Sequence, residues 1–135
     1  MDVRLRTNDS DCELALCDVI PQDDHPSYGC RLLVRSAGFA ADRPFWVERS
    51  VVAQFLEQVR AMDRTLTGRA LLQPLHEPDR VELELTRTGA VVVSGELGYA
   101  PSDNHLKFSF ITDQTCLRPL IAELGRLLEI DAPAV

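Results

Sequence analysis

A stretch of alternating apolar and polar residues in the second half of the chain constrains the fold most. In the sequence VELEL, apolar residues alternate with Glu82 and Glu84, which is the pattern of a strand with one buried face and one wet face. A turn at Thr88-Gly89 and the apolar run VVV follow, so residues 80–97 are predicted to form a β-hairpin. The two glutamates are therefore expected on a solvated sheet surface.

Shorter strand patterns recur on both sides of this hairpin. Residues 21–29 and 98–104 are rich in proline, glycine and acids, and are predicted to be loops. Gly95 and Gly98 are expected to allow a bulge or to end a strand. The remaining predicted strands cover residues 3–6, 12–17, 30–35, 45–47, 70–73 and 106–110.

Two segments have the period of an amphipathic helix. The first follows Ser50, a candidate N-cap, and ends before Gly68. The second follows Asp113 or Thr115, with a proline in its first turn, where that residue is tolerated. The apolar stripes consist of Val52, Phe55, Leu56, Val59 and Met62 in the first helix and Leu117, Leu120, Ile121, Leu124, Leu127 and Leu128 in the second.

The order of these elements determines the predicted fold class. Strands come in groups separated by a helix rather than alternating with helices, so a doubly wound parallel sheet is not expected. We predict an α+β fold with a mostly antiparallel β-sheet and two amphipathic helices. The length of 135 residues favours one layered domain over residues 1–135, with a frayed tail from about residue 131.

The chain is acidic, with 14 basic and 21 acidic residues and a formal net charge of −7. The basic residues, all arginines except Lys107, are scattered, whereas nucleic-acid-binding proteins normally show a basic stripe. We therefore expect no nucleic acid as a partner. The acidity favours a cationic partner, or only keeps the protein soluble. No apolar run is long enough for a transmembrane helix, and acids occupy the place of a signal peptide's apolar core, so no membrane partner is expected.

The four cysteines are predicted to be free thiols in a reducing compartment. They lie at positions 12, 17, 30 and 116 without a CxxC pair, mostly within apolar runs. A disulfide between Cys12 and Cys30 is the alternative. Cys116, near a helix start, is the least poor candidate for a nucleophile, but its apolar setting disfavours that role.

Motifs for catalysis or cofactor binding are missing from the sequence. It contains neither a glycine-rich phosphate loop nor GxSxG, so we predict no enzyme activity and no cofactor. The cluster Asp23-Asp24-His25 most resembles a metal site, and Asp103 and His105 could converge on it. Loops are rich in these residues for turn formation and solubility, so we expect no metal.

Two loops combine a tyrosine with acids, as binding surfaces often do. Aromatic side chains among carboxylates are suitable anchors for an Arg- or Lys-rich partner; alternatively, the tyrosines only cover a sheet edge. The predicted partner-binding residues are Asp23, Asp24, His25, Tyr28, Tyr99, Asp103 and Asn104.

From Val3 to about Ile130 the chain resembles the WapI-type immunity proteins of bacterial polymorphic toxin systems. The resemblance lies in the layout of VRLRTNDSDCELALCDV, GCRLLVRSAGFAADRPFWVERSVVAQFLEQV, RVELELTRTGAVVVSGELGY and LKFSFITDQTCLRPLIAELGRLL. It implies a small, cytoplasmic, non-enzymatic protein that binds and blocks a cognate toxin. Acidity agrees with this role, because an acidic blocker complements a basic cleft.

Two other functions remain open at this point. A small-ligand or regulatory binding module would have a concave apolar pocket between sheet and helix. A metal-dependent enzyme would use Asp23, Asp24 and His25.

Overall fold

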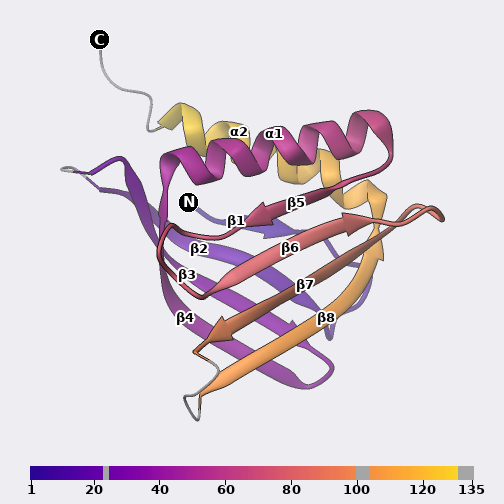
Figure 1. The fold of residues 1–135 in the computed structure, drawn as a ribbon, viewed down its shortest axis with the longest axis horizontal. Helices are drawn as coiled ribbons and strands as arrows, with labels where there is room; N and C mark the ends of the chain where they lie inside the picture. The colour runs from indigo at the N-terminus through magenta and orange to yellow at the C-terminus, as the bar shows by residue number, and fades with distance from the viewer. Residues whose placement is uncertain (23–24, 100–103, 131–135) are drawn as a thin grey trace.

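The computed structural model describes residues 1–22, 25–99 and 104–130. Its strands form two antiparallel four-stranded sheets, each followed in the chain by a helix (Figure 1). The α+β class is confirmed, with the strands divided between two sheets. The first sheet has the order β1 (Val3–Leu5), β2 (Glu13–Pro21), β3 (Ser27–Ser36), β4 (Phe39–Glu48), and the second β5 (Arg69–Leu72), β6 (Arg80–Leu85), β7 (Ala90–Gly98), β8 (His105–Asp113).

The predicted hairpin is formed by β6 and β7. Its alternation places Val81, Leu83 and Leu85 in the core, while the two glutamates between them point outward. Arg69 on β5 lies 3.4 Å from a carboxylate oxygen of Glu82 and 3.6 Å from one of Glu84. The sheet therefore has one packed face and one wet face, as predicted.

The two helices lie side by side along the top of the sheets (Figure 1). They are α1 (Arg49–Thr65) and α2 (Leu117–Ile130), the latter preceded by a short 3-10 turn at Gln114–Cys116. The apolar stripe of α1 is buried as predicted. The N-cap, however, is Glu48 rather than Ser50, because the helix continues directly from the end of β4. Asp113 caps the 3-10 turn through a 2.8 Å hydrogen bond from the Thr115 N–H.

Each helix covers the free edge of the first strand in the other half of the chain. The side chain of Gln58 on α1 accepts a hydrogen bond from the Leu71 N–H of β5, at 2.9 Å. In the same way, Glu123 on α2 accepts one from the Arg4 N–H of β1, at 3.1 Å. These contacts satisfy edge groups that would otherwise invite pairing with another chain. The two β-β-β-β-α units are therefore interlocked, and one continuous cluster of buried apolar residues runs through both.

No helix among the described residues is long and apolar enough to cross a membrane.

Candidate partner-binding surface

The structure corrects the prediction for Tyr28. This residue was expected in an exposed loop, but β3 begins at Ser27, so Tyr28 is a strand residue with 0% of its surface exposed. Its hydroxyl accepts a hydrogen bond from Arg49 at 3.2 Å. Tyr28 therefore packs within the core and supports the start of α1 instead of anchoring a partner.

Three of the other predicted binding residues are described and exposed. His25 lies in the loop between β2 and β3, Tyr99 directly follows β7, and Asn104 directly precedes β8. The side chain of Tyr99 is 64% exposed. Asp23, Asp24 and Asp103 lie outside the described residues.

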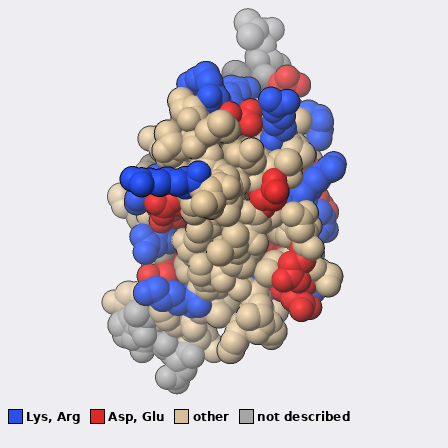
Figure 2. Space-filling view, turned by 90° about the vertical axis from the view of Figure 1, so that its right-hand side faces the viewer, with Lys and Arg blue, Asp and Glu red and all other residues tan. Residues whose placement is uncertain are grey.

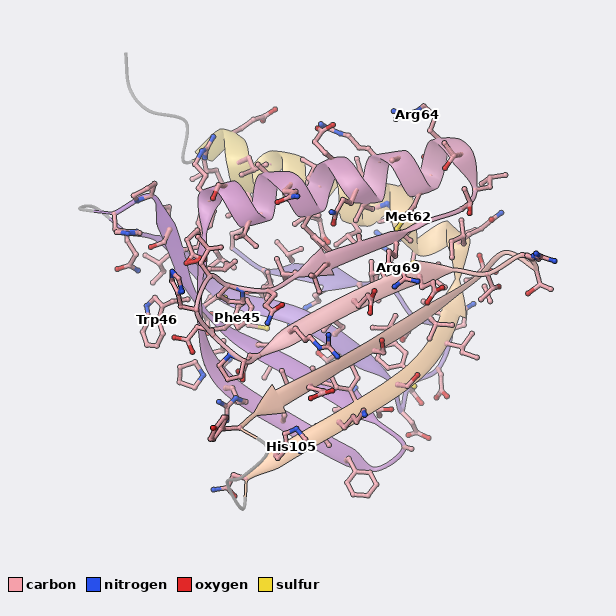
Figure 3. All side chains as sticks on the ribbon, in the orientation of Figure 1. Phe45, Trp46, Met62, Arg64, Arg69 and His105 are labelled. Carbon is pink, nitrogen blue, oxygen red and sulfur yellow. The ribbon has the colours of Figure 1, made fainter. Side chains whose placement is uncertain are left out.

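Trp46 is exposed at the edge of the first sheet. Its neighbours in β4, Phe45 and Val47, point into the core, so alternation turns Trp46 outward (Figure 3). The paired residue on β3 is Gly29, and a Cβ there would lie 3.1 Å from the indole nitrogen. The indole thus lies against a strand position without a side chain, and 61% of Trp46 remains exposed.

A second set of exposed apolar side chains lies beside Trp46. The loop between β5 and β6 contributes Leu75, which is 56% exposed and directly follows the buried Pro74. Leu71 and Tyr99 line one hollow with this loop, while Trp46 lines the adjoining hollow, and both hollows include Pro74 and Glu77. We call this continuous area the aromatic surface; it consists of Trp46, Leu71, Pro74, Leu75 and Tyr99.

Asp79 holds together the three segments that carry the aromatic surface. One of its carboxylate oxygens pairs with Arg43 Nε on β4 at 2.9 Å, and the other accepts the Gly98 N–H at 2.8 Å. Asp79 itself is buried. In addition, Glu48 accepts a 2.8 Å hydrogen bond from the Leu75 N–H. Charged bonds to buried groups are stronger than neutral ones, so the surface is presented on a firm support.

Charge is spread over the described surface rather than gathered in one place. On the face in Figure 2, basic and acidic side chains are interspersed around a mainly uncharged centre. On the outer face of the first sheet, for example, Arg31 pairs with Asp18 and Asp42 at 3.2 and 2.9 Å. Most of the described carboxylates are thus locally neutralised by arginines.

The interior offers no room for a small ligand among the described residues. The apolar cavity between the sheets and helices has a volume of about 30 Å³, which is room for roughly two water molecules. Ligand pockets are typically about 300–1,000 Å³. This finding weakens the alternative of a small-ligand module.

Two kinds of reactive group, nucleophilic cysteines and metal ligands, can be examined among the described residues. All four cysteines are free thiols. Burial raises the pKa of Cys30 and of Cys116 to about 12, so both remain protonated at neutral pH and are poor nucleophiles. No group of three His, Cys, Asp or Glu side chains in the described ranges could hold a metal ion. His105 instead faces Glu96, with 3.7 Å between its Nε2 and a carboxylate oxygen.

Most of the aromatic surface was not predicted from the sequence. Trp46 falls in the predicted strand 45–47, and no predicted element or site includes Leu75. Two signals were present: Trp46 is the chain's one tryptophan, and the run PLHEP sets Leu75 between prolines that exclude a strand. An apolar side chain in such a loop belongs to no strand or helix face that packs into the core, so it stays exposed.

Comparison with known proteins gives both a fold and a family. One solved chain, from the crystal structures of Trypanosoma bruciei MRP1/MRP2, is similar in fold, with a TM-score of 0.56 over 97% of this chain and 84% of that chain. Its sequence identity is 11%, so the likeness concerns the fold alone. No curated protein matches the chain. The sequence model of the immunity protein WapI-like family matches residues 9–130, and the chain therefore belongs to this family.

Proposed function

We propose that this protein binds a cognate toxin domain through the aromatic surface and blocks it without catalysis, in the cytoplasm. Membership of the immunity protein WapI-like family supports the role. The observation that carries the location is the exposure of Trp46, Leu75 and Tyr99 around two adjoining hollows, on a support fixed by Asp79. Exposed aromatic clusters of this kind mark protein interfaces, and aromatic side chains supply much of their binding energy.

The geometry suits a blocking partner better than a catalyst. The surface is apolar and firmly supported, so its side chains lose little freedom on binding. Loops on a rigid scaffold can also change in sequence without disturbing the core. These are the properties required of a protein whose binding face must match one particular toxin.

The test needs a toxin domain as partner, and the first candidate is any toxin encoded beside the gene of this protein. Because Trp46 is the one tryptophan, its fluorescence should change when the toxin binds. Trp46→Ala and Tyr99→Ala, measured by calorimetry, should each raise Kd roughly thirtyfold, equivalent to about 2 kcal/mol for an interface anchor. Cells that co-express the toxin with either variant should lose protection.

Phe39 provides the matched control. It is 67% exposed but lies at the opposite end of β4 from Trp46, so Phe39→Ala should leave Kd unchanged. If the parent protein binds the toxin and both surface variants bind equally well, the binding face lies elsewhere. If the parent neither binds nor protects, the proposed role itself is wrong.

A further inference from the structure

The hollow beside Trp46 has a defined shape. It has a volume of about 160 Å³ and is bordered by β4 on one side and by the β5–β6 loop on the other. Trp46 and Pro44 form its apolar border, and Pro74 and Glu77 face them from the loop. It is open to solvent at the surface, where Trp46, Pro44 and Glu77 are all exposed. A side chain of a partner can therefore enter it.

The hollow carries a net negative charge because, among the described residues, one of its two carboxylates has no ion-pair partner. Arg43 and Asp79 form an ion pair at 2.9 Å, so their charges offset each other. Within the described part of the chain, no basic side chain lies within ion-pair distance of Glu77. Glu77 lines this hollow and also the adjoining hollow of Leu75 and Tyr99. Glu77 is thus an exposed acid shared by both hollows of the aromatic surface.

We infer that this hollow receives an arginine side chain of the toxin, whose guanidinium lies on the Trp46 indole and pairs with Glu77. The inference rests on the proposed function and names the chemistry of the partner at that site. A cation over the face of tryptophan is attracted by the ring, and a carboxylate beside the ring adds a charged hydrogen bond. Both attractions act on the same group only where an aromatic ring and a free carboxylate border one hollow.

Arginine fits this hollow better than lysine does. Its guanidinium is planar, stacks on aromatic rings and pairs with a carboxylate through two parallel hydrogen bonds. It is also less strongly hydrated than an ammonium group, so less hydration is lost when it enters an apolar border such as that of Pro44 and Trp46.

The experiment measures binding of the neighbouring toxin domain by Glu77→Gln. This change removes the charge while keeping the shape of the side chain. We expect Kd to rise about tenfold or more, and the dependence of Kd on salt to become weaker, since a charge pair has been lost. Glu129→Gln is the matched control, because Glu129 is an exposed acid on α2 without an ion-pair partner among the described residues; its Kd should equal that of the parent.

Changing each arginine of the toxin to lysine identifies the partner group. One such change should weaken binding of the toxin to the parent protein. The same change should not weaken its binding to Glu77→Gln any further. If Glu77→Gln binds like the parent, or if no toxin arginine couples to Glu77 in this way, the inference is overturned while the proposed function stands. If the parent protein fails to bind the toxin at all, the proposed function fails and the inference with it.

Discussion

At the scale of single residues, Asp79 has the most consequential position. Its two carboxylate oxygens bind groups from different halves of the chain, Arg43 on β4 and the Gly98 N–H at the end of β7. Each of these groups adjoins a part of the aromatic surface. A buried carboxylate with two partners is costly to remove, because both partners lose their counterpart.

Asp79→Ala should lower the free energy of unfolding by about 2 kcal/mol, less than for a fully buried pair because Arg43 reaches water. Urea denaturation measures this loss. Asp79→Asn keeps an acceptor for Gly98 and loses only the ion pair, so its loss should be about half as large. An unchanged urea midpoint for Asp79→Ala would show that Asp79 does not hold these segments together.

At the scale of elements, the sequence predicted strands and helices better than their boundaries. Alternation identified β6 and β7 because one face is buried and the other wet. It could not set the start of β3, because the proline and glycine around Tyr28 indicate a loop while pairing with β4 extends the strand to Ser27. Pairing between distant segments decides such boundaries, and local sequence does not contain it.

The aromatic surface illustrates the same limit. Tyr99 was predicted because a single loop carries both the tyrosine and nearby acids. The hollows that Trp46 and Leu75 border adjoin only after β4 meets the β5–β6 loop. No periodicity within either segment encodes that meeting, so the composition of the site depends on the tertiary fold.

Two strand glycines should respond differently to alanine. A Cβ at Gly95 would lie 2.3 Å from the Arg80 carbonyl oxygen, a backbone atom of the paired strand that cannot move aside. We therefore expect Gly95→Ala to unfold at a much lower urea concentration, with a loss of about 3 kcal/mol, as for other overpacked core sites.

At Gly29 the nearest atoms belong to side chains. A Cβ would lie 2.8 Å from the amide nitrogen of Gln22 and 3.1 Å from the indole nitrogen of Trp46. Both side chains can turn aside, so Gly29→Ala should stay folded but shift the tryptophan fluorescence. Similar urea midpoints for the two variants would contradict this contrast.

At the scale of the whole molecule, the halves depend on each other. The first strand of each half is closed by the helix of the other, through Gln58 to Leu71 and Glu123 to Arg4. In addition, Arg49 at the start of α1 donates a 3.0 Å hydrogen bond to the Leu128 carbonyl near the end of α2. Without the other half, each half would leave the edge of its first strand uncovered.

Fragments 1–67 and 68–135 should therefore be unfolded separately and fold when mixed. Circular dichroism and urea denaturation of each fragment, and of an equimolar mixture, measure this. Each fragment alone should lack a cooperative transition, and the mixture should regain one. A fragment that unfolds cooperatively by itself would show that its sheet and helix form an independent core.

The mutual closure of the halves has a consequence for assembly. The connection between them is short: Leu66 and Gly68 adopt positive φ values of 56° and 101° to turn the chain from α1 into β5. If this connection straightened, α1 of one molecule could close β5 of a second molecule, and the second could return the same contact. Two chains that exchange halves in this way would remake between molecules each hydrogen bond that now joins the halves, giving a symmetric swapped dimer.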